Sequence, residues 1–557
     1  MTEAHPLLSR RYLATFRTSR IPHRFADLLV VGSGVAGLTA TLAASERPDV
    51  EVLLVSKDAI EESATRWAQG GVAAVLRPGA TEDSQEKHVA DTLAAAAGLA
   101  DPESVARTVS EGVERVEELL ALGVDFDRGP SGELQFTREG GHSRPRILPR
   151  GDTTGQEIER VLVERARQRE NVHILEHTFA LDLLTADGAC HGALLSGPGG
   201  RLEAAWARTT VLASGGAGRL YRETTNPPVC TGDGMAMAFR AGALLQDLEF
   251  VQFHPTTLYL AGAERFLITE AARGEGGVLR DGAGEAFMAR YHELKDLAPR
   301  DVVSRAILDV IRHRPENTVW LDLTGIGADK IRVRFPRILE YCRDFGIDIL
   351  KDPIPVRPCA HYSIGGVKTN IDAETSIEGL LAAGEVSCSG AHGANRLGSN
   401  SLLEGLVFGR RAGQIAASRV DSVPVPRPFS TADLPGGTPP AVRAPAPGGG
   451  DSCREVDLED LGRSLKSLLW YKVGVERSGD GLRAALQQIE SWIPYYLAGQ
   501  FDSPQSWSLQ NMLETAYLVT LSALRREESR GVHYRSDFPH RDDEKWKRHS
   551  ILSRDTI

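Results

Sequence analysis

The chain has 557 residues, more than one hydrophobic core usually supports, so we expect roughly two to four domains. Its formal net charge of −11 argues against binding to nucleic acid or to an anionic membrane surface, because a negative protein repels both. No apolar run approaches the ~20 residues of a membrane helix, and the six cysteines form no CxxC pair. These features favour a cytoplasmic protein with reduced thiols and predict no metal site.

Residues 1–25 form a basic stretch ahead of the first apolar run. The pair Arg10 and Arg11 is typical of a twin-arginine export signal, but further arginines occupy the place where an apolar region should follow. We therefore interpret residues 1–25 as a short N-terminal extension. An organelle transit peptide is the alternative, because the stretch is rich in arginine and poor in acids.

The first predicted unit is a strand, a tight glycine turn, a helix and a second strand. Apolar residues at 27–31 lead into GSGVAG, an alanine-rich stretch runs to about Ser45, and a second apolar run ends at Val55. The glycines permit a tight turn and let the backbone approach a pyrophosphate, which also faces the positive end of the helix dipole. The unit predicts dinucleotide binding by Gly32, Ser33, Gly34, Val35, Ala36 and Gly37.

The end of the second strand departs from the usual dinucleotide pattern. An acid that binds ribose is expected about 20 residues after the fingerprint, but Ser56 and Lys57 stand there. The Ser56 hydroxyl can hold a ribose hydroxyl and Lys57 can lie near phosphate, so the departure weakens a generic NAD assignment more than a flavin assignment. Alternatively, Lys57 is a solvated loop residue.

A glycine-rich and small-residue stretch, ATRWAQGGVAAV, follows the second strand. Its composition would let the backbone lie against a flat ring, whereas a plain loop needs no such composition. The candidate cofactor contacts in this stretch are Ala64, Thr65, Gln69, Gly70 and Gly71.

Downstream, helical and strand-like segments alternate and are interrupted once. Residues 82–122 have apolar side chains at helical spacing, and strand-like runs follow at VHILEH, ALLSG and TTVLASGG. Between 256 and 356 the chain changes to short mixed elements, before glycine-dense and sheet-like sequence resumes. We therefore expect an α/β fold: a Rossmann-like nucleotide-binding domain (26–255 and 357–420) interrupted by an α+β domain (256–356).

The C-terminal part begins with a stretch full of proline and glycine, residues 421–452, which predicts a linker. Three helical runs follow, near 457–470, 481–493 and 509–528. They predict a C-terminal helical bundle over residues 453–557.

Three separated regions carry histidines and arginines among glycines: QFHPTT, TEAARGEGG with APRD, and HYSIGG with HGANRLGSNS. Such groups can bind two carboxylates through charge-assisted and partly bidentate hydrogen bonds, so we predict a cage for a small dicarboxylate. The alternative is ordinary packing for the histidines and a structural ion-pair cluster for the charged members, Glu275 especially. The cage comprises His254, Thr269, Glu270, Arg273, Arg300, His361 and Arg396.

Together these motifs resemble the succinate dehydrogenase, fumarate reductase and L-aspartate oxidase flavoprotein family, from about Asp27 to RGVHYRSDFP near the C-terminus. The resemblance implies bound FAD and an inserted domain that closes over the substrate as a cap. It assigns proton transfer or charge stabilisation to Arg300, supported by Glu270 and Arg273. It also implies flavin contacts at Asp233, Glu385, Ser401 and Leu402, and substrate contacts at Gln252, His254, Thr269, His361 and Arg396.

Two positions distinguish members of this family. Ala64 lies where succinate dehydrogenases and quinol-linked fumarate reductases carry the histidine that binds FAD covalently, so the resemblance implies non-covalent FAD. Glu139, in TREGGHS, matches a carboxylate that can pair with a substrate α-ammonium group. A solvated loop glutamate is the alternative for Glu139.

The resemblance thus implies oxidation of L-aspartate to iminoaspartate, with dioxygen or fumarate as electron acceptor, in NAD biosynthesis ahead of quinolinate synthase. One alternative is a soluble fumarate reductase or succinate dehydrogenase flavoprotein subunit, against which Ala64 and Glu139 weigh. The other is a flavin-fold binding protein without turnover, against which the intact cage weighs.

Overall fold

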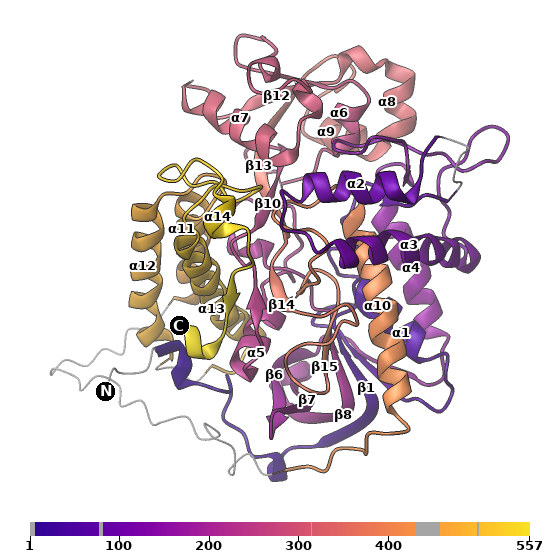
Figure 1. Ribbon diagram of the computed structural model, residues 1–557, viewed down its shortest axis with the longest axis vertical. Helices are drawn as coiled ribbons and strands as arrows, with labels where there is room; N and C mark the ends of the chain where they lie inside the picture. The colour runs from indigo at the N-terminus through magenta and orange to yellow at the C-terminus, as the bar shows by residue number, and fades with distance from the viewer. Residues whose placement is uncertain (1–5, 77–81, 264, 314, 430–456, 498–500) are drawn as a thin grey trace.

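The computed structural model describes residues 6–76, 82–263, 265–313, 315–429, 457–497 and 501–557. Its centre is a seven-stranded sheet of order β5-β2-β1-β8-β7-β6, with β15 paired to β8 (Figure 1). The β5, β2, β1, β8 and β15 strands run parallel, and β6 and β7 pair antiparallel at one edge. The strands are β1 His23–Val31, β2 Val52–Val55, β5 Val172–Leu175, β6 Phe179–Ala186, β7 Ala189–Ser196, β8 Leu202–Leu212 and β15 Leu380–Ala382.

Helices α1 (Val35–Ala44) and α10 (Asn400–Arg419) pack against each other beside this sheet (Figure 1). Every residue of α1 is buried, because the helix lies between the sheet and α10, and its small side chains allow a close approach. The parallel strands are accordingly continuous apolar runs: all four residues of β2 are buried. The α/β Rossmann-like fold is confirmed. The layer around the sheet includes α4 Thr154–Arg167 and α5 Asp233–Ala241.

The predicted helical stretch 82–122 is two helices, α2 (Gln85–Ala95) and α3 (Pro102–Leu122). Asp101 caps α3 by accepting a hydrogen bond from the Glu103 backbone N–H, and Pro102 occupies its first turn. The apolar periodicity did not reveal the break between the two helices, whereas the N-cap residue Asp101 and Pro102 mark where the second helix begins.

The inserted region forms a cap around a second sheet of order β10-β13-β12-β11. The predicted limits, 256 and 356, fall inside β10 and β13, which pair antiparallel and run from the nucleotide-binding part into the cap (Figure 1). We keep 256–356 as the proposed extent of the capping domain. Its elements are β10 Val251–Leu258, α6 Glu270–Gly274, β11 Val278–Arg280, α7 Arg300–Arg312, β12 Val319–Asp322, α8 Ala328–Arg334, α9 Pro336–Asp344 and β13 Ile354–Ser363.

The C-terminal part contains three long helices, α11 (Leu458–Lys472), α12 (Gly479–Leu497) and α13 (Pro504–Arg525), as the periodicity predicted. Residues 526–557 are not part of that bundle. They carry α14 (Asp543–Trp546), β17 (Ile551–Leu552) and the short 3-10 helix η9 (Arg554–Thr556), and β17 joins a small sheet of order β16-β14-β9-β17 in the nucleotide-binding part. The other short strands are β3 Val72–Ala73, β4 Ile147–Leu148, β9 Leu245–Gln246, β14 Gly366–Lys368 and β16 Ser387–Cys388. Most of the predicted linker lies outside the described residues.

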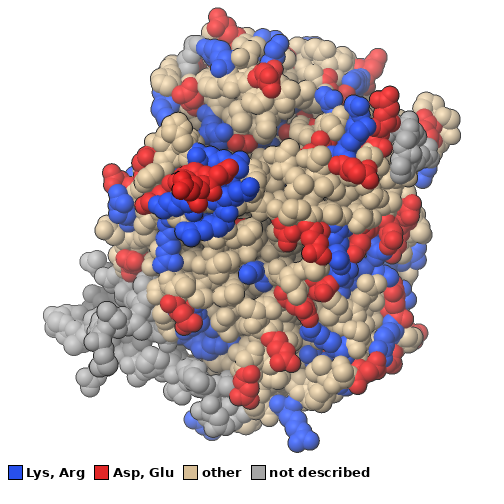
Figure 2. All heavy atoms as spheres, viewed as in Figure 1, with Lys and Arg blue, Asp and Glu red and all other residues tan. Residues whose placement is uncertain are grey.

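The basic N-terminal segment packs onto the molecule. Tyr12, Leu13 and Phe16 are buried in a cluster with Trp206 and Trp507. The helices in the described ranges include none that is long and apolar enough to cross a membrane. Over the face seen in Figure 2, acidic and basic side chains are intermixed.

Candidate active site

A single cavity joins the predicted cofactor and substrate residues. It begins at the turn between β1 and α1 and ends between the body and the cap, where its walls include every cage residue except Arg273. Among the predicted residues, its walls include Gly32, Ser33, Gly34, Val35, Ala36, Ser56, Lys57, Ala64, Thr65, Gln69, Gly70, Gly71, Glu139, Asp233, His254, Thr269, Glu270, Arg300, His361, Glu385, Arg396, Ser401 and Leu402.

Three predicted residues do not line this cavity: Gly37, Gln252 and Arg273. A Cβ atom on Gly37 would lie 1.9 Å from the carbonyl oxygen of Gly32, so this glycine serves the packing of α1 against the turn. Gln252 and Arg273 are buried directly behind lining residues, and they act on the cavity through hydrogen bonds.

The fingerprint end has the geometry of a pyrophosphate site. Gly32 has a φ of +111°, which turns the chain from β1 into α1. The first helical N–H, on Val35, donates to the Thr65 hydroxyl at 2.9 Å, and the Ser33 and Ser56 hydroxyls lie 3.1 Å apart. Backbone donors at a helix start and paired hydroxyls beside them suit phosphate and ribose oxygens.

The predicted charged contacts Lys57 and Asp233 pair with each other. The Lys57 Nζ lies 2.7 Å from Asp233 Oδ2, and it also donates to the Thr231 hydroxyl at 2.7 Å. Asn511, on α13, donates to the other Asp233 oxygen at 2.8 Å. The lysine is therefore held at the cavity wall by an ion pair, which differs from the solvated-loop alternative.

The residues present fit FAD. The side-chain oxygens of Gln69 and Ser214 are buried, line the cavity and have no hydrogen-bond partner in the part of the chain that the structure describes, as groups that bind a polar cofactor would. Burial raises the pKa of Glu385 to about 7, and its carboxylate accepts from the Ser363 backbone N–H at 2.8 Å. Ala64 lines the same wall and offers no nucleophile for a covalent bond.

Two guanidinium groups meet at the substrate end and share one acceptor. Arg300 Nη1 and Arg396 Nε donate to the same Gln252 side-chain oxygen, at 3.1 and 3.2 Å. Arg396 also donates to Ser401 and lies 4.3 Å above the Tyr362 ring. No carboxylate of the described residues hydrogen-bonds to Arg396, and burial, then Arg300, lowers its pKa to about 10. Among the described residues, this buried cation therefore has no hydrogen-bonded anionic partner.

The two histidines lie together, with ring centroids 5.1 Å apart. Burial, then neighbouring arginines, holds the pKa of both His254 and His361 well below 6.5. The Thr256 backbone N–H donates to His254 Nδ1, which fixes the ring proton of His254 on Nε2. Both rings are thus neutral, and His254 presents a neutral N–H donor.

Arg300, Glu270 and Arg273 form a relay that leads away from the cavity. Arg300 Nε donates to Glu270 at 2.6 Å, and Arg273 donates to the other Glu270 oxygen at 3.1 Å. Burial would raise the pKa of Glu270, but Arg300 and Arg273 outweigh it and keep the pKa below 4.5. Thr269 caps α6, which carries Glu270 and Arg273. Glu275 lies outside this relay and pairs with Lys330 and Arg334, as its structural alternative predicted.

Glu139 is buried at the cavity wall, which argues against the solvated-loop alternative. Its carboxylate accepts from the Ser399 hydroxyl at 2.9 Å and has no ion-pair partner within 4.0 Å in the described residues. Burial, then the charge of Glu270, raises its pKa above 4.5. A Cβ atom on Gly398 would lie 2.7 Å from Glu139 and 3.0 Å from Arg300, so only glycine leaves room there.

The sequence interpretation missed several residues of this site, among them Ser214, Ser399 and Tyr362. Ser399 orients Glu139 and has a φ of +62° at the start of α10. Tyr362 lines the cavity under Arg396. Each lies within a motif that the sequence analysis singled out, so its position in the motif was the available signal. Serine and tyrosine are common throughout proteins, so the residue type alone did not mark these positions as functional.

Comparisons with known proteins agree with this geometry. A family model described as an FAD binding domain matches residues 27–402, and one described as the fumarate reductase flavoprotein C-terminus matches residues 462–556. An L-aspartate oxidase of Streptomyces coelicolor is 43% identical over 95% of this chain and 91% of its own length. The chloroplastic L-aspartate oxidase 2-b of Nicotiana tabacum is 43% identical over 93% of this chain and 82% of its own length.

Solved structures show the same architecture. E. coli quinol fumarate reductase (FrdA) superposes with a TM-score of 0.88 at 33% identity, over 96% of this chain and 95% of that one. Mycobacterium smegmatis Sdh1 superposes with a TM-score of 0.81 at 34% identity, over 95% and 92%. Fold and cavity thus define an FAD-binding flavoprotein with a capping domain.

Within that class, full-length similarity at 39–43% identity is to proteins named L-aspartate oxidase. The chain belongs to the L-aspartate oxidases of the succinate dehydrogenase and fumarate reductase flavoprotein family.

Proposed function

We propose that this chain oxidises L-aspartate to iminoaspartate with non-covalent FAD. One observation carries the proposal: the cavity holds an unpaired buried guanidinium, Arg396, and an unpaired buried carboxylate, Glu139. A substrate that satisfies both must carry an anionic and a cationic group. Succinate and fumarate have only anionic groups, whereas aspartate has two carboxylates and an α-ammonium group.

The cage residues bind and orient aspartate. Arg396 clamps one carboxylate through its free N–H groups, and the neutral His254 and His361 rings donate to carboxylate oxygens without adding charge. Glu139 pairs with the ammonium group, and its raised pKa makes it a suitable acceptor for the proton that the amine must lose. FAD, when bound, supplies the hydride acceptor.

Arg300 stabilises charge next to the reacting carbon. Its bond to Glu270 keeps it fixed, and the Glu270–Arg273 pair offers a route for a proton away from the cavity. Because the cap carries Arg300 and the body carries Arg396, closure of the cap brings both cations to the substrate and excludes water.

We further propose that dioxygen or fumarate is the electron acceptor of the reaction. The reaction would serve de novo NAD biosynthesis in the cytoplasm, ahead of quinolinate synthase. Support comes from relatives named L-aspartate oxidase in bacteria such as Streptomyces coelicolor and Nostoc.

An assay of the purified protein tests the proposal. Aspartate should bleach the flavin without oxygen and release peroxide in air, whereas succinate should do neither. Acid precipitation should leave a yellow supernatant, because Ala64 cannot hold FAD covalently. Turnover with succinate and none with aspartate would instead establish the alternative, a fumarate reductase or succinate dehydrogenase flavoprotein subunit.

A further inference from the structure

The cap helix α7 touches the body through two charged residues that lie outside the cavity. Arg300 is the first residue of α7, and Asp301 and Arg305 follow it on one side of the helix, four positions apart. Arg305 Nη2 donates to Asp301 Oδ2 at 2.9 Å. The pair is thus preformed on the cap.

Each member of this pair has a partner in the body. The Asn395 side-chain N–H donates to Asp301 Oδ1 at 3.3 Å, and Asn395 in turn accepts from Gln252 at 3.0 Å. Arg305 Nη1 donates to the Gly531 carbonyl at 3.3 Å, and its guanidinium lies 5.4 Å over the Tyr534 ring. One contact therefore reaches the acceptor that Arg300 and Arg396 share, and the other reaches the C-terminal segment.

The C-terminal segment offers a rigid surface here. We name residues 526–550 the C-terminal clasp. Its turn is closed at both ends, since the Arg530 and His533 backbones exchange hydrogen bonds at 2.8 and 3.0 Å. Gly531 has a φ of +53°, and a Cβ atom there would lie 2.2 Å from the Ala394 carbonyl oxygen, so the turn abuts the loop that carries Arg396.

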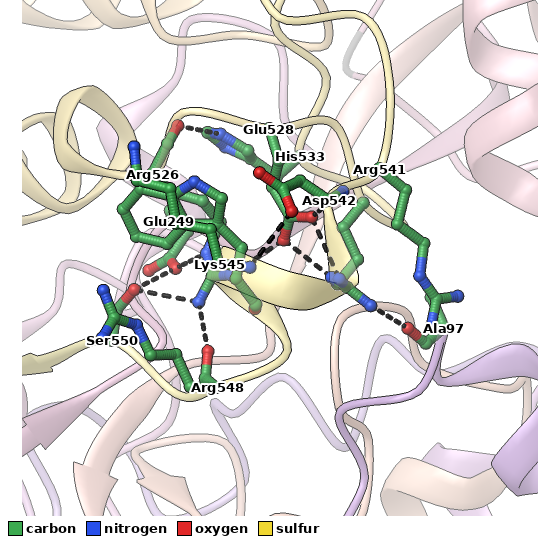
Figure 3. A network of polar contacts seen from close by, with 12 residues as sticks. Ala97, Glu249, Arg526, Glu528, His533, Arg541, Asp542, Lys545, Arg548 and Ser550 are labelled. Atoms are coloured by element: carbon green, nitrogen blue, oxygen red, sulfur yellow. Dashed lines mark hydrogen bonds and ion pairs between the residues drawn. The ribbon is translucent and has the colours of Figure 1, made fainter.

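A buried ion network fixes that turn (Figure 3). Arg530 donates to both Glu528 oxygens, at 2.7 and 3.0 Å, and to the Ala97 carbonyl at 2.9 Å. Arg526 joins Glu528 to Glu249, two residues before β10. The turn is thereby tied to two distant parts of the body, Ala97 and the segment before β10.

From these contacts we propose that Asp301 and Arg305 are positioning residues, which seat α7 on the C-terminal clasp and on Asn395 and thereby set the location of Arg300. Val303, Ile307 and Val310 bury the opposite side of α7 in the cap core, so a shift of the helix moves the cap with it. The inference rests on the proposed function only in that Arg300 acts on the substrate.

Substitutions on α7 test the inference. Arg305→Met keeps the length of the side chain but removes both body contacts. We expect the rate of flavin bleaching by aspartate, per bound FAD and at saturation, to fall about tenfold with little change in KM, because a small misplacement of a reacting group costs that much or more. Arg332→Met is the matched control, since Arg332 is an exposed cap arginine that pairs with Asp329 within α8.

A double variant separates positioning from mere stability. In an Arg300→Lys background, Arg305→Met should change the bleaching rate less than about twofold, because a residue that acts through Arg300 is not additive with it. Additive effects would overturn the inference, as would an Arg305→Met rate equal to that of Arg332→Met. If Arg305→Met does not fold, Arg305→Lys replaces it in these assays, because lysine keeps the positive charge but lacks the planar guanidinium.

Hydrogen exchange supplies a readout that needs no turnover. Amides of residues 300–312 should exchange faster in Arg305→Met than in Arg332→Met, and Tyr534→Leu should behave like Arg305→Met whereas Tyr534→Phe should not. Equal exchange in all four variants would refute the seating of α7. If the wild-type protein showed no activity with aspartate but the variants gave the expected exchange pattern, the proposed function would be refuted and the positioning role would stand.

Discussion

The buried arginines of the C-terminal clasp and Arg396 of the cage differ in how their charge is balanced. In the C-terminal clasp, Arg526 and Arg530 each bond to carboxylates, and the attraction of Glu249 outweighs burial and raises the pKa of Arg526 (Figure 3). In the cage, Arg396 shares a neutral amide acceptor with Arg300 and has a lowered pKa of about 10.

The difference separates structural arginines from binding ones. A buried cation with its own carboxylate has its desolvation cost offset, so it holds chain segments together. A buried cation without one stays poorly solvated until an anion arrives, so its free energy favours ligand binding. Identical side chains at equal burial thus serve different ends because of their partners.

The largest expected effect concerns stability, in the clasp. Arg526→Leu leaves Glu249 buried without its guanidinium, so the free energy of unfolding should fall by about 3–5 kcal/mol. Urea denaturation measures the change, and the KM for aspartate of the folded enzyme should stay near its wild-type value. Arg541→Leu removes an exposed pair with Asp543 and should cost less than about 0.5 kcal/mol. Equal losses in the free energy of unfolding in Arg526→Leu and Arg541→Leu would show that burial with a carboxylate gives Arg526 no special structural role.

The second prediction concerns binding, in the cage. Arg396→Leu should raise the KM for aspartate about 100-fold, since a charge-assisted bidentate contact is worth up to roughly 3 kcal/mol. FAD content and the free energy of unfolding should hold, because no protein carboxylate loses its partner. Arg396→Lys retains the charge without the planar guanidinium, so its KM for aspartate should lie between those of the wild type and Arg396→Leu. A wild-type KM in Arg396→Leu would refute the clamp.

The third prediction concerns the unpaired carboxylate. Glu139→Gln keeps the shape and the acceptor for Ser399 but removes the charge that pairs with the ammonium group. We expect kcat/KM for aspartate to fall about tenfold while fumarate reduction is unchanged, so the ratio of the two activities reports specificity. Glu117→Gln, on the exposed side of α3, is the control. Equal losses with both substrates would show that Glu139 has no role in selecting aspartate.

The pH profile sharpens this assignment. Glu139 must be ionised to pair with ammonium, and burial raises its pKa above 4.5, so kcat/KM for aspartate should decline on acidification before an ordinary glutamate would titrate. The Glu139→Gln variant should lack this decline. No histidine inflection near 6.5 is expected, because the pKa values of His254 and His361 lie well below it. An inflection near 6.5 that survives in Glu139→Gln and is lost when His254 or His361 is also replaced would contradict the neutral histidines, whereas one lost on replacement of Glu385 would not.

The cofactor half was easier to predict from the sequence because much of its signal is contiguous. Gly32 to Gly37 are adjacent in the chain, and the strand and helix around them follow from apolar runs. The cage was found only as separate motifs. That Gln252 bridges Arg300 and Arg396, 48 and 144 positions away, follows from the tertiary arrangement of β10, α7 and the loop before α10, and not from any local pattern.

The C-terminal clasp lies within the predicted C-terminal helical domain, residues 453–557, but between 526 and 550 only α14 is helical. Its dense charges are typical of a solvated surface, yet Arg526, Glu528, Arg530 and His533 are at most 2% exposed. Burial of these residues depends on partners such as Glu249, almost 280 positions away in the chain, so no window along the sequence reveals it.

The smallest expected effect tests whether neutral partners only orient the unpaired cation. Ser401 accepts a hydrogen bond from Arg396 without contributing charge. Ser401→Ala should therefore raise the KM for aspartate only about three- to fivefold, the value of one neutral hydrogen bond, with Gln252 still in place. Ser401→Thr keeps the hydroxyl and serves as the control. An effect as large as that of Arg396→Leu would mean that orientation, and not unpaired charge, governs binding in the cage, and the contrast with the clasp would then rest on geometry alone.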